Sequence, residues 1–454
     1  MSAKRRLFGT DGIRGKANVF PMTCEVATRL GRAITHFFQL REEGERPIII
    51  IGKDTRLSCY MLEQALAAGV CSQGGMAILT GPLPTPGVAF CVQSMRARAG
   101  VMISASHNRY MDNGIKIFDR TGHKLPDEVE LQIEEMVLDP HSIPVPLEDK
   151  LGKAMRLDQV IGRYIVYAKS SLKGMDSLDK MKVVLDCANG ASYVVAPMIF
   201  SELGAHVKAL GVSPNGKNIN LNCGSLHPEY CAGHVKKYGA DVGLAFDGDA
   251  DRLTVIDENG ESIHGDRIIG LLSRYLLETG QLAHTREIVG TVMSNLGLEL
   301  YLARQGLTLF RTDVGDRYIV ERMRESGALF GGEPSGHLIF KHLSTTGDGI
   351  VSALKVLECV HHYGRSVGEL AREVPLYPQA NKSVMVKKKP EFKTVGSIAR
   401  GLERIQGRLG ERGRVLLRYS GTEPKARVMV EGESDELVEG LCGELAQVIE
   451  TSLG

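Results

Sequence analysis

Three aspartates stand at alternating positions in GLAFDGDADRLTVID, where an apolar run typical of a strand leads into Asp247, Asp249 and Asp251. Three carboxylates this close repel one another at neutral pH, and a bound divalent cation relieves the repulsion. The EF-hand is a competing interpretation, but it needs glycine at its sixth position, where this chain has Arg252, and flanking helices rather than strands. We therefore predict a metal site, with Mg²⁺ as the ion because it takes few protein ligands. A solvated acidic turn is the alternative.

The hydroxyl of Ser106 follows a second strand-like run, in the segment AGVMISASHNRYMDNGIKIF. In a chain that also carries a metal loop, such a hydroxyl can carry a phosphoryl group while the metal neutralises the charge in transfer. A serine hydrolase would need a GxSxG turn, which this segment lacks. His107 comes next, and on an extended segment it should point away from Ser106. Lys116 follows ten residues after Ser106, on the next expected strand. An ordinary strand-end serine is the alternative.

The segment RYSGTEPKAR near the C-terminus has the residue types of an anion site. Its backbone N–H groups and hydroxyls can point toward one centre, and its arginines offer planar, bidentate donors. The candidate phosphate-binding residues are Arg418, Ser420, Gly421, Thr422 and Arg427. A polar turn with surface arginines is the alternative.

Two glycine-rich segments could contact a ligand through their backbone. GGEPSGHLIF presents Glu333, Ser335 and His337, and a carboxylate with a hydroxyl two residues away can bond neighbouring sugar hydroxyls. FGTDGIRG places Arg14 between glycines, and it matches neither the dinucleotide fingerprint nor a P-loop. Arg14 can reach a phosphate from such a loop. For both segments a purely structural turn is the alternative.

The nine cysteines include no CxxC pair, which indicates reduced and mostly buried thiols. One cluster, Cys223, His227, Cys231 and His234, raises the question of zinc. The dipeptide His227-Pro228 instead indicates the start of a helix that runs to about residue 238, and the spacing fits no common zinc module. We expect no zinc there.

Length and composition limit the class of protein. A chain of 454 residues exceeds one hydrophobic core and predicts about three or four domains. With 43% hydrophobic residues, 24% charged residues and a net charge of +1, nothing favours nucleic acid or a membrane surface as a partner. No apolar run approaches the ~18 residues of a spanning helix, and the N-terminus lacks the apolar core of a signal peptide. We expect a cytoplasmic protein.

The remaining pattern is repetitive. Three times, from residues 46, 181 and 286, an Ile- and Val-rich strand leads through a turn, a helix and a glycine into another strand. Each pass is typical of a βαβ unit, and in the first we expect a helix from Ser58 to Gln73 with Ser58 as its N-cap. A proline-rich segment (138–150), a polar turn (257–262) and a change of pattern after 372 mark expected boundaries. The expected domains are 1–150 with the serine segment, 151–257 with the metal loop, 258–372 with the sugar loop, and 373–454, a small α+β domain.

Taken together, FGTDGIRG, GKDTRLS, SASHN…DNGIK, DGDADR, VGDRY, GEPSGH and RYSGTEP resemble the α-D-phosphohexomutase family. The resemblance spans nearly the whole chain. It implies four domains around a central cleft, the first three sharing a mixed α/β/α sandwich fold and the fourth a smaller α+β domain. FGTDGIRG and VGDRY favour the members that interconvert the 6- and 1-phosphates of glucosamine. Members that act on glucose or mannose phosphates use the same parts, and a catalytically silent sugar-phosphate sensor is a further interpretation.

The resemblance also implies roles for single residues. Ser106 is then phosphorylated, and Mg²⁺ is held by the phosphoserine with Asp247, Asp249 and Asp251. The implied sugar-binding residues are Glu333, Ser335 and Arg252, and the RYSGTEPKAR residues named above hold the phosphate that is not reacting. Candidates for proton transfer and charge stabilisation are Lys116, Arg14, His107 and His337. A hexose 1,6-bisphosphate is the implied primer, and the implied partners are a small-molecule sugar phosphate and, in a homodimer, a second copy of the chain.

The chain departs from the family pattern at two positions. Arg109 stands where proline usually follows Ser-His-Asn, and Pro334 occupies a variable position of the sugar loop where proline is rare. Neither change removes a functional group.

Overall fold

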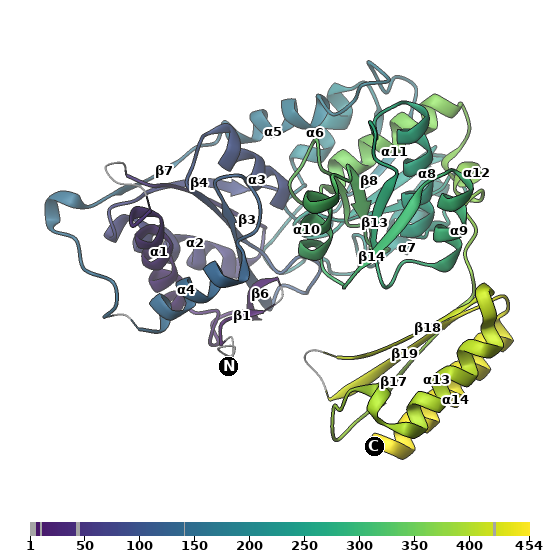
Figure 1. Ribbon diagram of the computed structural model, residues 1–454. Helices are drawn as coiled ribbons and strands as arrows, with labels where there is room; N and C mark the ends of the chain where they lie inside the picture. The colour runs from purple at the N-terminus through teal and green to yellow at the C-terminus, as the bar shows by residue number, and fades with distance from the viewer. Residues whose placement is uncertain (1–5, 10, 42–45, 140, 421–423) are drawn as a thin grey trace.

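The computed structural model describes residues 6–9, 11–41, 46–139, 141–420 and 424–454. These residues form four sheets, of seven, five, four and three strands, and helices cover them (Figure 1). The predicted mixed α/β architecture with a smaller α+β domain at the C-terminus is confirmed. In the described part of the chain, no helix is long and apolar enough to cross a membrane.

The first sheet has the strand order β1-β2-β6-β5-β3-β4-β7. Its strands are β1 (Phe8–Gly9), β2 (Gly12–Lys16), β3 (Ile48–Lys53), β4 (Met76–Pro82), β5 (Ala99–Ile103), β6 (Asp112–Asp119) and β7 (Lys153–Arg156). Its helices are α1 (Cys24–Gln39), α2 (Leu57–Ser72), α3 (Thr85–Ser94) and α4 (Asp127–Leu138). The parallel neighbours β3 and β4 flank α2 in sequence, as a βαβ unit requires.

The start of α2 differs from the sequence-based expectation. The helix begins at Leu57, and Arg56 occupies the N-cap position without a side-chain capping bond. Ser58 was predicted as the N-cap, which is wrong: it lies inside the first turn, and its hydroxyl accepts a hydrogen bond from Asn113 Nδ2 (2.8 Å). The backbone N–H of Arg56 donates instead to Asp54 Oδ1 (2.9 Å), so the chain turns into the helix two residues before Ser58.

The second and third sheets repeat the parallel strand–helix–strand unit. The second contains β8 (Lys182–Asp186), β9 (His206–Leu210), β10 (Val242–Phe246), β11 (Leu253–Ile256) and β12 (Ser262–Ile263), with helices α5 (Val160–Lys169), α6 (Val195–Glu202) and α7 (Pro228–Tyr238). The third contains β13 (Glu287–Thr291), β14 (Thr308–Thr312), β15 (Phe330–Gly332) and β16 (Leu338–Phe340), with helices α8 (Gly265–Glu278), α9 (Leu296–Arg304), α10 (Asp316–Ser326), α11 (Gly349–Tyr363) and α12 (Val367–Ala371). Strand pairs β8/β9 and β13/β14 are parallel, so all three predicted βαβ units are confirmed.

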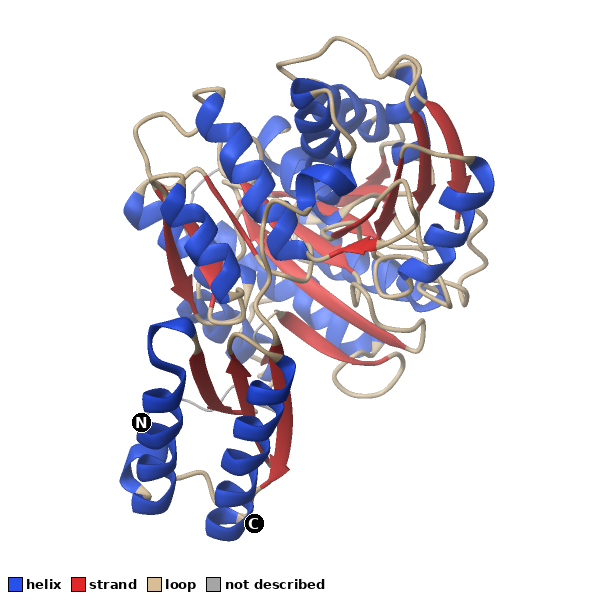
Figure 2. Ribbon diagram, turned by 90° about the vertical axis from the view of Figure 1, so that its right-hand side faces the viewer, coloured by secondary structure: helices blue, strands red, loops and turns tan. Residues whose placement is uncertain are grey.

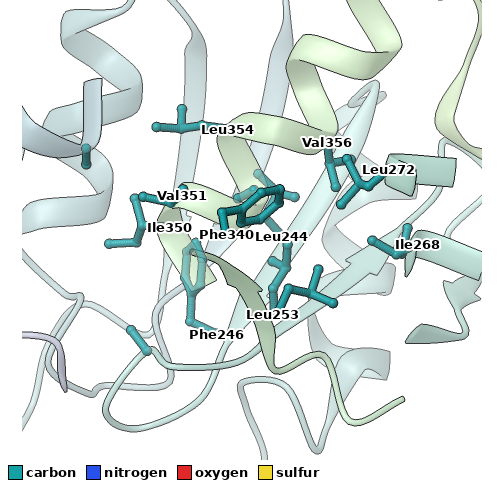
Figure 3. Packing of buried hydrophobic residues seen from close by; sticks show 14 of the residues in the cluster. Leu244, Phe246, Leu253, Ile268, Leu272, Phe340, Ile350, Val351, Leu354 and Val356 are labelled. Atoms are coloured by element: carbon teal, nitrogen blue, oxygen red, sulfur yellow. The ribbon is translucent and has the colours of Figure 1, made fainter. Parts of the chain in front are cut away.

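One hydrophobic core joins the first three sheets. It contains Met102 of β5, Phe246 of β10 and Phe340 of β16, all fully buried or nearly so. In Figure 3, Phe340 and Phe246 lie beside Ile350 and Val351 of α11. This shared core fixes the three domains against one another, and therefore fixes the loops that meet between them.

The fourth sheet stands apart with its own core. Its strands β17 (Gln379–Met385), β19 (Lys425–Glu431) and β18 (Arg414–Tyr419) are antiparallel in that order. Helices α13 (Gly396–Leu409) and α14 (Asp435–Leu453) run side by side along one face of the sheet (Figures 1 and 2). Short 3₁₀ turns lie at η1 (Glu148–Lys150), η2 (Phe392–Thr394) and η3 (Gly410–Arg412).

Candidate functional site

The three aspartates lie in the loop of the β10–β11 hairpin. Phe246 and Leu253, on either side of this loop, are anchored in the shared core (Figure 3). One carboxylate oxygen from each of Asp247, Asp249 and Asp251 lies within 4.8 Å of the others, and all three side chains are buried. This is the one such cluster of His, Cys, Asp or Glu among the described residues, so the segment from Cys223 to His234 forms no comparable group.

Two of these carboxylates each have one oxygen that accepts no hydrogen bond among the described residues. Asp249 Oδ1 and Asp251 Oδ1 are buried, and no hydrogen-bond donor reaches them within the described part of the chain. Burial and the charges of Asp251 and Asp249 raise the pKa of Asp247 well above its ordinary value. A buried set of carboxylate oxygens with unused acceptors fits a small divalent cation.

Ser106 directs its hydroxyl into this acidic loop. It follows β5 and has a φ of +52°, in the left-handed region that residues other than glycine rarely adopt. Its Oγ donates to Asp247 Oδ2 at 2.5 Å, which brings together two segments 141 positions apart. The sequence analysis connected the serine with the acidic loop only through their expected chemistry. In the structure they are in direct contact.

The side chain of His107 contradicts the expectation that it points away from Ser106. Its Nδ1 lies 3.2 Å from Ser106 Oγ. The expectation assumed an extended chain, but the positive φ of Ser106 breaks the alternation of side chains. Burial, with Arg252 and Arg14 adding to it, lowers the pKa of His107 to about 4, so the ring is neutral at pH 7.

Lys116 enters the same loop from β6. Its Nζ lies 3.1 Å from Asp249 Oδ2, 3.3 Å from Asp251 Oδ2 and 3.6 Å from Asp11 Oδ2. Burial alone would lower the pKa of Lys116, but the carboxylates of Asp11, Asp249 and Asp251 outweigh it and raise that pKa well above its ordinary value. Lys116 is therefore a permanent cation, suited to stabilising negative charge rather than to accepting a proton.

The two candidate arginines each lie beside an aspartate of the site. Arg14, on β2, donates through Nη2 to Asp11 Oδ2 at 2.5 Å. The backbone N–H of Arg252 donates to Asp247 Oδ1 at 3.2 Å, and its Nε lies 3.8 Å from Asp251 Oδ1. Both guanidinium groups retain N–H donors that could bind a phosphate.

The candidate sugar loop is the turn of the β15–β16 hairpin. Glu333 Oε1 accepts from the Gly315 N–H (2.9 Å), and Glu333 Oε2 accepts from Ser335 Oγ (3.2 Å). His337 is buried between Asp251 Oδ1 (3.8 Å) and Asp316 Oδ2 (3.5 Å). Burial opposes protonation of His337, but these two carboxylates outweigh it and raise its pKa to about 10.

Five of the candidate residues line a common cavity of about 220 Å³: Ser106, Asp251, Arg252, Glu333 and His337. Asp11, Lys124 and Asp316 are among the wall residues that were not singled out from the sequence. Lys124 Nζ pairs with Asp11 and, at 2.8 Å, with Asp316 Oδ2, so it ties the first domain to the third. Asp11 and Asp316 lie within the motifs FGTDGIRG and VGDRY, which could have identified them from the sequence. No motif contains Lys124.

The candidate phosphate site lies on the fourth domain. Arg418 of β18 and Arg427 of β19 are cross-strand partners. They line a second cavity, of about 280 Å³, together with Lys382 and with Met293 of the third domain. Burial and the neighbouring Arg427 lower the pKa of Arg418, as expected of two cations close together. Ser420, which follows β18, is buried. Gly421 and Thr422 lie outside the described residues.

The two departures from the family pattern leave these groups in place. Arg109 is exposed, and its carbonyl accepts a partly buried hydrogen bond from Arg56 Nη1 (2.7 Å). Pro334 packs its backbone against Gly265, where a Cβ would come within 2.2 Å of the Pro334 carbonyl oxygen.

Three α/β domains, a small fourth domain, and a serine set against an acidic loop together define the class of the phosphohexose mutases. Models for domains I, II, III and IV of phosphoglucomutase/phosphomannomutase match residues 5–142, 163–260, 264–377 and 381–448. The chain belongs to this family.

Two relatives of known name match at full length. The phosphoglucosamine mutase of Syntrophotalea carbinolica is 51% identical over 452 residues, covering 99% of this chain and 98% of the relative. That of Nitratidesulfovibrio vulgaris is 52% identical over 450 residues, covering 99% of both chains.

Solved structures agree in fold. A phosphoglucomutase/phosphomannomutase family protein from Burkholderia thailandensis has a TM-score of 0.82 at 23% identity, with 98% of this chain and 97% of that chain covered. The N-acetylphosphoglucosamine mutase of Aspergillus fumigatus, solved with GlcNAc-6P and magnesium, has a TM-score of 0.70 at 17% identity, with 99% and 96% covered.

Proposed function

We propose that this protein interconverts glucosamine 6-phosphate and glucosamine 1-phosphate through a phosphorylated Ser106 and a bound 1,6-bisphosphate. The observation that carries the proposal is the contact of Ser106 Oγ with Asp247 inside a buried acidic loop (2.5 Å). Identities of about half over the whole chain to phosphoglucosamine mutases support the amino sugar as substrate. The product would supply UDP-N-acetylglucosamine synthesis and, through it, cell-wall precursors.

In the proposed reaction, phosphoserine 106 gives its phosphoryl group to the O1 hydroxyl of glucosamine 6-phosphate. The bond from phosphorus to Ser106 Oγ breaks as the bond to the sugar oxygen forms, and the sugar hydroxyl loses its proton. The resulting bisphosphate turns end for end, and its 6-phosphoryl group returns to Ser106. In this scheme neutral His107, whose Nδ1 lies 3.2 Å from Ser106 Oγ, takes the proton from the sugar hydroxyl and returns it to Ser106 Oγ as that oxygen leaves phosphorus. The cations Lys116, Arg14 and His337 stabilise the charge in transfer.

A cation completes the proposed site. Asp247, Asp249 and Asp251, together with the phosphorylated Ser106, would hold Mg²⁺, which neutralises the charge of the phosphoryl group when bound. The buried oxygens Asp249 Oδ1 and Asp251 Oδ1, which accept no hydrogen bond among the described residues, support this assignment. The identity of the ion, the hexose 1,6-bisphosphate primer and a cytoplasmic location belong to the same proposal.

Substrate recognition is divided between two domains in this proposal. Glu333, Ser335 and Arg252 bind the sugar, since they line cavities at the third domain's hairpin. The fourth domain, with Arg418, Ser420, Gly421, Thr422 and Arg427, holds whichever phosphate is not reacting. Because the fourth domain has its own core, it can close over the substrate about Tyr377 and Pro378, the part of the segment 377–381 that precedes β17.

The experiment compares kcat/KM for the 6-phosphates of glucosamine, glucose and mannose, each with its bisphosphate primer. We expect glucosamine 6-phosphate to be the best substrate and activity to require Mg²⁺. A higher kcat/KM with glucose or mannose 6-phosphate would reassign the substrate within the family. No isomerisation of any of them would leave a sugar-phosphate sensor as the function.

A further inference from the structure

The backbone carbonyl of Ser106 is held by two side chains from different domains. Its oxygen accepts from Arg56 Nη2 (2.8 Å) and from Asn220 Nδ2 (2.9 Å). Arg56 precedes α2 of the first domain, and Asn220 lies in the loop between β9 and α7 of the second. Ser106 has a φ of +52°, a conformation that persists only where surrounding contacts stabilise it. The two hydrogen bonds to its carbonyl supply such contacts.

Arg56 is fully buried and has no donor left for a ligand. Its Nε donates to Asp54 Oδ2, its Nη1 to the carbonyls of Asn108 and Arg109, and its Nη2 to those of Ser106 and Asn108, at 2.7–2.9 Å. A guanidinium group has five N–H donors, and these five bonds use them all. Arg56 therefore belongs to the support of the serine loop and not to the phosphate-binding set.

The other side of the loop is fixed by a chain of hydrogen bonds that starts at the same carboxylate. Asp54 Oδ2 accepts from Ser104 Oγ (2.6 Å), which in turn accepts from the Ser106 N–H (2.9 Å). The N–H and the C=O of Ser106 are thus both anchored to the Asp54–Arg56 pair. Only the side chain of Ser106 is left to point outward, toward Asp247.

Asn220 provides the second half of the support. Its Nδ2 donates to the carbonyls of both Ser106 and Asn108, at 2.9 Å each. The space beside these bonds is closed, because a Cβ on Gly248 would lie 2.6 Å from the Ser106 carbonyl oxygen and 2.8 Å from Asn220 Nδ2. The metal loop, which contains Gly248, can therefore approach the serine only because this position lacks a side chain.

We propose that Arg56 and Asn220 are positioning residues for the phosphoryl-transfer step, which hold the Ser106 carbonyl so that its Oγ faces the acidic loop. The inference rests on the proposed function, since it concerns the same serine. It gives a role to the motif GKDTRLS, whose Arg56 is fully buried and lines neither of the two cavities described above. In this inference the first and second domains each supply one donor to the same carbonyl.

The test measures phosphoryl transfer from glucose 1,6-bisphosphate to the dephosphorylated full-length enzyme, followed by intact mass, together with kcat, KM and thermal unfolding. The variants are Arg56→Lys, Arg56→Met and Asn220→Gly; glycine at 220 accepts the positive φ of 55° found there. The control Lys53→Met/Glu63→Gln removes a neighbouring buried ion pair that does not touch the serine loop.

We expect Arg56→Met and Asn220→Gly to lose about 100-fold in transfer rate and kcat, as for a misplacement near 1 Å, with KM nearly unchanged. Arg56→Lys should recover part of the loss, and the control should keep its transfer rate.

The outcomes separate this inference from the function on which it rests. Wild-type enzyme that never gains phosphate on Ser106 would refute the function itself. Phosphorylation of the wild type with equal transfer rates in Asn220→Gly and the Arg56 variants would overturn the positioning role alone. A rise in KM at unchanged kcat would also overturn it, because it would make Arg56 a substrate-binding residue. If the Arg56 variants do not fold, the rate in Asn220→Gly decides.

Discussion

A buried carboxyl in the third domain predicts an unusual dependence of stability on pH. Asp266, in the first turn of α8, is fully buried and accepts one N–H bond, from Asn295 at 2.8 Å. Its other oxygen has no partner among the described residues. Burial, with the charge of Glu431 from the fourth domain adding to it, raises the pKa of Asp266 to about 7.

The direction in which stability changes with pH depends on the protons that Asp266 binds in the folded and the unfolded states. An unfolded aspartate has a pKa near 3.9, so between about pH 4 and 7 the folded protein binds more protons at Asp266 than the unfolded chain does. The contribution of Asp266 to stability is therefore complete below about pH 4 and is lost as pH rises through about 7. The rise of the Asp266 pKa from about 3.9 to about 7 corresponds to roughly 4 kcal/mol of lost folding stability by pH 8.

The variant Asp266→Asn tests this magnitude because it keeps the shape and removes the charge. An unpaired buried amide group costs about 1–3 kcal/mol, which offsets part of the gain at pH 8. We expect a net gain of about 1–3 kcal/mol near pH 8, and a much flatter dependence on pH than in the wild type.

Urea unfolding near pH 5 and pH 8 measures both quantities. The matched control is Asp158→Asn, whose carboxylate is 77% exposed and should change neither. The reasoning fails if Asp266→Asn loses as much stability between the two pH values as the wild type does.

Three further predictions concern the site and the packing that supports it. Ser106→Ala should abolish turnover while thermal unfolding stays nearly unchanged; retained isomerase activity would refute the role of this serine. Asp249→Asn should raise the Mg²⁺ concentration for half-maximal rate by about tenfold or more, since it removes a charged ligand; an unchanged titration would exclude it as a ligand. Gly69→Ala should destabilise the first domain by about 1–3 kcal/mol, because its Cβ would lie 2.1 Å from the Thr28 carbonyl oxygen of α1. In contrast, Gly407→Ala, with open space around its Cβ, should be neutral or stabilising by up to about 1 kcal/mol; equal effects of the two would contradict the packing argument.

The parts of the fold that the sequence predicted are those with a local signal. Buried parallel strands appear as continuous Ile and Val runs, so the three βαβ units could be found, as could the helix that starts at Pro228. Strand β7 could not, because its four residues are all exposed and it pairs with β4 only after a long connection. The expected boundaries at 150, 257 and 372 remain predictions.

The same distinction holds for the site. Asp247, Asp249 and Asp251 cluster within five residues, so their shared chemistry was evident from the sequence. The position of His107 was not, because it depends on the positive φ of Ser106, which only tertiary contacts stabilise. Arg56 and Asn220, which lie 164 positions apart, meet at one carbonyl, and no sequence spacing reports such an encounter.

The central claim is that the Ser106 oxygen carries the transferred phosphoryl group. The direct measurement is the mass of the active enzyme and of its peptides, before and after incubation with glucosamine 6-phosphate and a bisphosphate primer. The account predicts one phosphoryl group on the peptide that contains Ser106, and its loss in Ser106→Ala. A fully active enzyme with no phosphate on that peptide would contradict the account.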